Sequence, residues 1–193
     1  MKSVVYHGSP TGDIKEIKAH ISTHGKKCIY ATDNKVVAML FMGSSMGDLD
    51  TVLAISEGLP ILVERRSGVL KNNYNQPGYI YELDGSSFRH HKYLWKAEVI
   101  SFKESIEPIK CDYYENILDT LIDEEKKGNL KIYHYPNRPD NIPVDNSDLI
   151  DKYIRAYKNG NKKAIYNLLK YYPEFENRVL KKLGWESVND EEF

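Results

Sequence analysis

The sequence predicts an α+β fold, with a sheet core followed by a small helical C-terminal extension. Short apolar segments that end at glycine, proline or aspartate fill much of residues 1–135, a pattern typical of strands. From about residue 147 the apolar residues recur at helical spacing instead. With 193 residues, the chain is long enough for one hydrophobic core and an appendage.

The first forty residues predict two strand ends separated by a polar loop. Residues 4–10 read Val-Val-Tyr-His-Gly-Ser-Pro, which indicates a β-branched strand that ends in a turn. A second short strand is expected at residues 28–31. Thr32 and Asp33 follow it, and we expect them to cap a helix over about 33–42.

The middle of the chain predicts a second helix and further strands. Leu49, Val52 and Leu53 lie at helical spacing, which favours a helix over 48–56. Residues 71–76 are polar and predict a loop, whereas apolar residues on one face indicate a helix within 111–127. The remaining strands are expected at residues 61–65, 78–85, 95–101, 105–109 and 130–135.

The C-terminal part predicts three helices after a linker that contains prolines. The linker comprises residues 136–146, so the expected organisation is a core over 1–135 and a helical extension over 147–193. Helices of this length are not stable alone and must pack on one another or on the sheet. They are expected at Asp148–Tyr157, Lys163–Tyr171 and Glu176–Leu183.

Composition excludes some classes of function. The net charge of −1 gives no overall attraction to nucleic acid or to anionic membranes, and no apolar run approaches the length of a membrane span. Cys28 and Cys111 are predicted to be free thiols in a reducing compartment, and we expect a cytoplasmic protein. His20 and His24 are four residues apart, but their segment does not look helical, so no metal site is expected.

Three motifs occur in an order that resembles a known enzyme fold. They are His7-Gly8, the segment from Gly25 to Thr32 followed by Ala38 and Phe41, and Glu98-Val99-Ile100-Ser101 followed by Pro108-Ile109. Together they resemble the ADP-ribosyltransferase fold of the diphtheria-toxin and poly-ADP-ribose-polymerase type, which has a split sheet. The resemblance covers about residues 3–110, with 40–78 loosely aligned.

The resemblance implies mono-ADP-ribosyl transfer from NAD to an acceptor, with release of nicotinamide and no metal. It gives His7, Tyr30 and Glu98 catalytic roles. His7 would hydrogen-bond the adenosine ribose, Tyr30 would stack on nicotinamide, and Glu98 would stabilise an oxocarbenium-like transition state. The backbone of Gly8 would contact the nicotinamide amide, and the implied NAD contacts also include Ser9, Ser22 and Ala31.

Several alternatives stay open at the level of sequence. Glu82 or Asp84 could be the site carboxylate, because one residue of register decides which side chain faces the cleft. The same site could instead hydrolyse NAD, or bind NAD or ADP-ribose without turnover. The chain could also be a bacterial or phage interaction protein without enzymatic activity. The acceptor is expected to be protein rather than nucleic acid, because no basic stripe is present.

Overall fold

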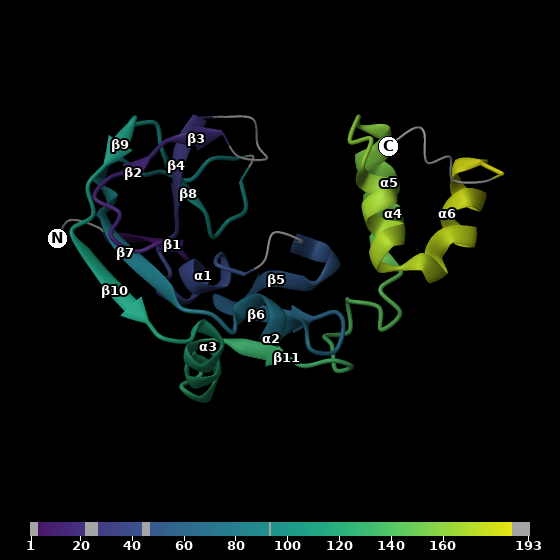
Figure 1. The fold of residues 1–193 in the computed structure, drawn as a ribbon, viewed down its shortest axis with the longest axis horizontal. Helices are drawn as coiled ribbons and strands as arrows, with labels where there is room; N and C mark the ends of the chain where they lie inside the picture. The colour runs from purple at the N-terminus through teal and green to yellow at the C-terminus, as the bar shows by residue number, and fades with distance from the viewer. Residues whose placement is uncertain (1–3, 22–26, 44–46, 93, 187–193) are drawn as a thin grey trace.

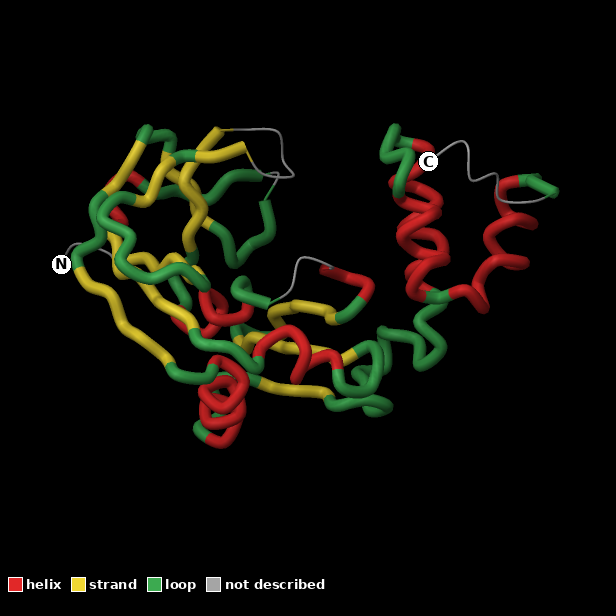
Figure 2. Tube along the Cα trace, in the orientation of Figure 1, coloured by secondary structure: helices red, strands yellow, loops and turns green. Residues whose placement is uncertain are grey.

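The computed structural model describes residues 4–21, 27–43, 47–92 and 94–186, and its fold is α+β with small, mostly antiparallel sheets (Figures 1 and 2). The strands are β1 (Val4–Ser9), β2 (Ile17–Lys18), β3 (His20–Ile21), β4 (Lys27–Ala31), β5 (Thr51–Ser56), β6 (Leu59–Glu64), β7 (Gly78–Asp84), β8 (Val99–Ser101), β9 (Ser105–Ile106), β10 (Lys110–Tyr114) and β11 (Lys131–Tyr133). The α-helices are α1 (Lys35–Leu40), α2 (Val69–Tyr74), α3 (Ile117–Lys126), α4 (Asp148–Lys158), α5 (Ala164–Tyr171) and α6 (Glu176–Leu183). Three single turns of 3-10 helix are η1 (Gly47–Leu49), η2 (Gly85–Ser87) and η3 (Pro173–Phe175).

The N-terminal strands form a sheet that is split between β1 and β4. Strand β7 pairs with β1 on one side and with β10 on the other, while β4 pairs with β3 and β8. An antiparallel bridge between Tyr6 and Thr32 joins β1 to β4, which gives the order β8–β4–β1–β7–β10. Within the described residues this bridge is the one pairing between β1 and β4. The two strands therefore diverge on the side where β1 carries His7.

Alternating side chains place the two faces of this sheet in different hydrophobic clusters. Val5, Ile29 and Val99 contribute to a cluster on one face. On the other face, α1 packs against β1 and β7, and its buried residues join a larger cluster that also includes Ile80. The helix begins after Asn34, whose Oδ1 accepts hydrogen bonds from the backbone of the first turn at 2.9 and 3.2 Å. The prediction that Thr32 and Asp33 cap this helix is thus wrong by one or two positions.

A second sheet, in the order β11–β6–β5, lies beside the first (Figure 1). Strands β5 and β6 form a hairpin whose turn uses Glu57 and Gly58, both with positive φ. The predicted helix over 48–56 is wrong, because β-branched and apolar residues pair along the whole hairpin from Thr51 to Ser56. Its helical spacing was accidental: a run that is apolar at most positions satisfies either period.

Three more predictions need correction. Residues 71–76 are not a loop, since most of them belong to α2, in which Tyr74 is buried and donates to the Leu40 carbonyl at 3.0 Å. The helix expected within 111–127 begins only at Ile117, because residues 110–114 pair with β7 as strand β10. The strand expected over 95–101 is regular only from Val99, since a turn precedes it.

The predicted helices of the C-terminal part are present as α4, α5 and α6, and Figure 1 shows them at one end of the molecule, away from the split sheet. They enclose their own hydrophobic cluster, in which Leu149, Ile165 and Val179 are fully buried. One residue of the cluster comes from far earlier in the chain. Leu49, only 1% exposed, packs among the helices, and its carbonyl oxygen accepts a hydrogen bond of 2.7 Å from the Tyr172 hydroxyl.

Two arginine side chains, buried Arg65 and half-buried Arg138, connect the helices to the rest of the molecule. Arg65, directly after β6, donates to both carboxylate oxygens of Asp148 at 2.9 and 2.7 Å. Asn146 accepts from Arg65 at 3.1 Å and from Arg138 at 2.5 Å, and Arg138 also donates to the Arg65 carbonyl at 2.8 Å. We call these four residues the arginine joint. It ties together β6, the linker and the first turn of α4.

No helix within the described ranges is long and apolar enough to cross a membrane. Cys28 is buried and Cys111 is exposed, and neither forms a disulfide.

Candidate functional site

Three of the predicted site residues lie on neighbouring strands of the split sheet. His7 is near the end of β1, Tyr30 is on β4, and Glu98 directly precedes β8. Since β4 pairs with β8 and bridges to β1, the central strand carries Tyr30 and its two neighbours carry the other two residues. The sheet thus brings together residues that are up to 91 positions apart in the sequence (98 minus 7).

His7 spans the split between β1 and β4. Its Nδ1 lies 2.8 Å from the carbonyl oxygen of Tyr30, which can only accept, so Nδ1 carries the proton. In the neutral ring Nε2 is then an acceptor, and it has no hydrogen-bond partner among the described residues. Burial lowers the pKa of His7, the bond to Tyr30 opposes that effect, and nearby His20 lowers it further. The imidazole is therefore neutral at pH 7, with an acceptor directed away from Tyr30.

Tyr30 is half-buried, and its partner in the antiparallel pairing of β4 with β8 is Ile100. Its ring centroid lies 5.4 Å from that of His20, with 49° between the ring planes. His20 is exposed on β3, directly opposite Cys28. On sequence grounds His20 was weighed only as a metal ligand, together with His24. Its place beside Tyr30 was not predicted, because the pairing of a two-residue strand such as β3 has no recognisable pattern.

Glu98 is held in the turn that leads into β8. Its backbone N–H donates to the Trp95 carbonyl at 2.9 Å, and its Oε2 accepts from the Trp95 N–H at 3.2 Å. Since Val99 pairs with Ala31 and Ile100 pairs with Tyr30, Glu98 directly precedes the part of β8 that runs beside Tyr30. The Trp95 ring packs edge-on against Phe41, with the centroids 5.8 Å apart, which anchors this turn to the end of α1.

The two rival carboxylates lie on β7, on the far side of β1 from Tyr30. Glu82 is opposite Tyr6 in the β1–β7 pairing, and Asp84 is opposite Val4 at the start of β1. Asp84 also accepts from the Ser86 N–H at 3.0 Å and caps the short helix η2. Of these three carboxylates, Glu98 is the one beside β8, which pairs with β4, the strand that carries Tyr30.

The remaining predicted contacts have structural partners or lie outside the described residues. A Cβ at position 8 would overlap the carbonyl oxygen of Ala38, so Gly8 allows α1 to pack directly on β1. Ser9 is buried and accepts from the Thr11 N–H at 3.0 Å, and Ala31 is buried in the cluster beneath the sheet. Ser22 is not among the described residues.

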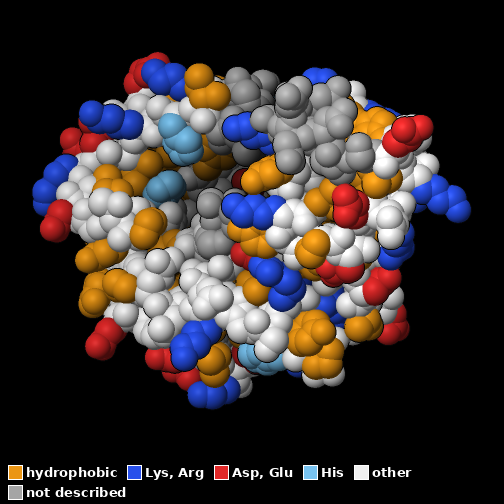
Figure 3. Space-filling model, turned by 45° about the vertical axis from the view of Figure 1, so that its right-hand side comes forward, with side chains coloured by type: hydrophobic (Ala, Val, Ile, Leu, Met, Phe, Trp, Pro, Cys, Tyr) orange, Lys and Arg blue, Asp and Glu red, His pale blue; other side chains and the backbone are white. Residues whose placement is uncertain are grey.

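Figure 3 shows a hollow near the middle of one face of the molecule, with histidine side chains at one edge and lysine and arginine side chains across from them. The described part of the chain contains no group of three or more His, Cys, Asp or Glu side chains that could hold a metal ion.

No protein-family model matches the chain, and neither a curated protein nor a solved structure shows significant similarity to it. What the chain does must therefore be inferred from its own residues and their geometry.

Proposed function

We propose that this protein transfers ADP-ribose from NAD to an acceptor and releases nicotinamide. The observation that carries the proposal is the hydrogen bond of His7 across the split to Tyr30, beside a strand whose first turn holds Glu98. His7, Tyr30 and Glu98, which are among the residues that motivated the resemblance to ADP-ribosyltransferases, lie on or directly beside three adjacent strands, and this arrangement supports the proposal. NAD is the substrate here, and the reaction needs no metal.

Each residue suits one part of this reaction. The neutral Nε2 of His7 would accept a hydrogen bond from a ribose hydroxyl, and the ring of Tyr30 would stack on nicotinamide. The C–N bond between nicotinamide and the ribose breaks, and its electron pair leaves with nicotinamide. The carboxylate of Glu98 would stabilise the positive charge that develops on the ribose and orient the incoming nucleophile, whose proton is lost on attack.

The test is nicotinamide release from NAD by the purified protein, compared with Glu98→Gln. This change keeps the shape of the side chain and removes its charge, and we expect the rate to fall about a hundredfold or more. Glu82→Gln is the matched control, because it removes a carboxylate from β7, and it should retain most of the activity. If both variants release nicotinamide at the wild-type rate, Glu98 is not the site carboxylate.

The same assay separates the alternatives. Free ADP-ribose formed without any acceptor would indicate an NAD glycohydrolase. NAD binding by calorimetry without nicotinamide release would indicate a module that binds NAD without turnover. If wild-type protein neither binds nor cleaves NAD, the proposal fails and a role in interaction with a partner protein is favoured. A protein acceptor remains our expectation, because the net charge of −1 does not favour nucleic acid.

A further inference from the structure

Strand β10 forms one edge of the split sheet, and its outer side is open. In the order β8–β4–β1–β7–β10 it pairs with β7 alone, and no other strand of the described residues lies beside it. Figure 1 shows β10 along the outer margin of the molecule. The free backbone groups of an exposed edge strand can pair with a further strand.

Two residues of β10 direct their backbone groups outward. The Ile109 N–H donates to the Glu82 carbonyl at 2.8 Å, so the backbone of Glu82 bonds on the side of β10. Bonded pairs alternate along an antiparallel ladder, and Glu82 is paired with Lys110. The N–H and C=O groups of Cys111 and Tyr113 therefore point away from β7. Neither residue has a backbone hydrogen bond on that side within the described ranges.

The side chains along this edge are complementary to their own reversed order. Ile109 is 64% exposed and Tyr113 is 58% exposed, so a large apolar or aromatic side chain lies near each end. Cys111, at the centre, is an exposed free thiol. Lys110 and Asp112 flank it and carry opposite charges. Reversal of residues 109–113 about Cys111 therefore exchanges a cation with an anion and an apolar side chain with an aromatic one.

The charges at this edge balance within each copy of the chain. Asp112 pairs with Lys110 at 2.7 Å and with Lys35 at 2.6 Å. Glu82 of β7 is directly opposite Lys110, and its negative charge attracts that lysine. Two cations and two carboxylates leave no net charge, so two such edges would not repel each other as a whole.

We propose that two copies of this chain associate through β10, with the two strands antiparallel and Cys111 on the two-fold axis. Each Cys111 would exchange both of its outward backbone hydrogen bonds with its counterpart, and the two sheets would become continuous. Lys110 of each copy would lie opposite Asp112 of the other, at non-bonded positions of the ladder, where facing side chains are closest. In the same register, Ile109 would lie opposite Tyr113.

Charge favours this register over the neighbouring symmetric ones. A two-fold axis at Asp112 would place two carboxylates directly opposite each other, which is unfavourable. An axis at Tyr113 would place Asp112 opposite Tyr114, so neither Lys110 nor Asp112 would face an opposite charge across the interface. The axis at Cys111 thus gives two attractive pairs and no repulsive one.

Association through β10 does not depend on the proposed transferase activity. Strands β10 and β8 lie at opposite edges of the sheet, and Glu98 directly precedes β8. The interface would therefore be remote in the sheet from Glu98, and either proposal can fail without the other.

The test is the mass of the full chain in solution, measured by light scattering during size-exclusion chromatography at about 100 μM protein. We expect twice the mass of one chain. A monomeric wild-type chain at this concentration would overturn the proposal and would leave the edge for a different protein.

Lys110→Glu is the decisive variant, with Lys170→Glu as its matched control. Lys110→Glu would place like charges opposite each other at both symmetric positions, and we expect the association to weaken about a hundredfold. Lys170→Glu makes the same change of charge at an exposed position of α5 and should leave the dimer intact. Equal association of the two variants would contradict the proposed contact between Lys110 and Asp112.

A short bifunctional thiol reagent tests the register. The α-carbons of the two Cys111 residues would be about 5.5 Å apart, so the reagent should link two wild-type chains. Cys111→Ser should abolish the link, because Cys28 is buried. If Cys111→Ser is combined with Tyr113→Cys, the new thiols would lie about 13 Å apart along the ladder, and little cross-linking is expected. Cross-linking of this double variant but not of the wild type would contradict an axis at Cys111.

Discussion

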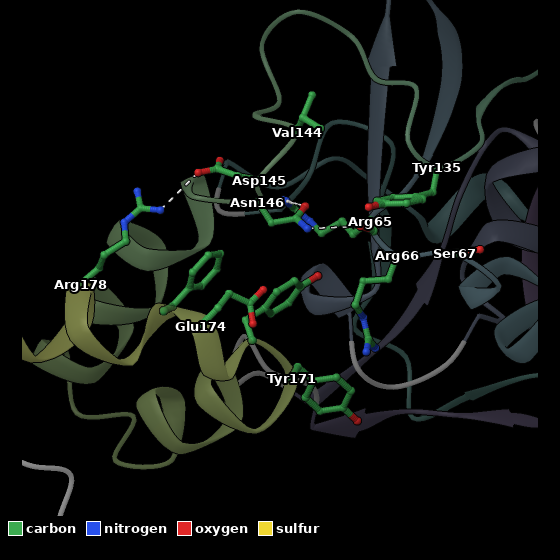
Figure 4. A pocket seen from close by; sticks show the side chains of 12 residues that line it. Arg65, Arg66, Ser67, Tyr135, Val144, Asp145, Asn146, Tyr171, Glu174 and Arg178 are labelled. Carbon is green, nitrogen blue, oxygen red and sulfur yellow. Dashed lines mark hydrogen bonds and ion pairs between the residues drawn. The ribbon is translucent and has the colours of Figure 1, made fainter.

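The split sheet and the arginine joint are assembled by different kinds of contact. His7, Tyr30 and Glu98 are positioned by backbone pairing of adjacent strands, and each belongs to a strand or directly precedes one. The arginine joint connects the residue after β6, the linker and the first turn of α4, which are held together by the ion pair of Arg65 with Asp148 and by hydrogen bonds of Arg65 and Arg138 to Asn146 (Figure 4 shows Arg65 and Asn146). His7, Tyr30 and Glu98 can therefore be displaced from one another only if the sheet is disrupted, whereas the arginine joint depends on single charged side chains.

The largest effect should come from a charge of the arginine joint. Asp148→Asn leaves the guanidinium of Arg65, whose side chain is 4% exposed, without a carboxylate. We expect the free energy of unfolding to fall by about 3 kcal/mol, the low end for a broken buried pair because Asp148 itself is 34% exposed. Asp151→Asn on the same helix is the control, since its exposed pair with Lys182 should contribute less than about 1 kcal/mol. Urea unfolding at pH 7 measures both, and equal effects would show that the joint is not held by buried charge.

The corresponding test on the split sheet is Gly8→Ala. The new Cβ would collide with a backbone carbonyl of α1, which cannot move without the helix, so we expect a loss of about 2 to 3 kcal/mol. Gly58→Ala tests backbone conformation alone, because Gly58 has a φ of 85° and open space around it. It should cost about 1 kcal/mol. Urea unfolding of the two variants gives the comparison, and a smaller loss for Gly8→Ala than for Gly58→Ala would contradict the packing argument.

A smaller effect is expected for the aromatic surface of the proposed NAD site. Tyr30→Leu should weaken NAD binding by about tenfold, because leucine cannot stack on nicotinamide, whereas Tyr30→Phe keeps the ring and should change affinity little. Calorimetry with NAD measures both. Tyr113→Leu on β10 controls for the loss of a tyrosine elsewhere in the sheet. NAD affinity that is the same for the leucine and phenylalanine variants of Tyr30 would exclude stacking.

The smallest effect concerns pH. The pKa of His7 is lower in the folded protein than its usual 6.5, mainly because of burial. Below pH 6.5 the unfolded chain therefore binds a proton that the folded protein does not. The free energy of unfolding consequently decreases as the pH is lowered through that range. Above pH 6.5 both states are neutral at this position, so it contributes no slope. The free energy of unfolding should drop less between pH 7.5 and 5.5 in His7→Gln than in the wild type, and equal drops would contradict burial of the imidazole.

Much of the split sheet could be predicted from local sequence. A strand that ends in His-Gly, a short strand before a helix and a later strand after Glu98 are each recognisable within a few residues. The helices α4, α5 and α6 were predicted almost to the residue, because their apolar spacing ends at Asn159, Pro173 and Gly184.

The arginine joint could not be predicted in this way. Arg65, Arg138 and Asp148 are separated by 73 and 10 residues (138 minus 65, 148 minus 138), and each lies among ordinary polar neighbours. Nothing in those segments shows that they meet, because their encounter depends on how the linker folds. The strand β5 was missed for a related reason, since its identity is decided by pairing with β6 rather than by its own spacing.

The burial of Leu49 among the C-terminal helices has a consequence for synthesis of the chain. Leu49 leaves the ribosome about a hundred residues before Leu149, which belongs to the same cluster (149 minus 49). At about 5 to 20 residues per second, this delay is about 5 to 20 seconds. During that interval the nascent sheet presents an uncovered leucine, and the helices that are made last cover it.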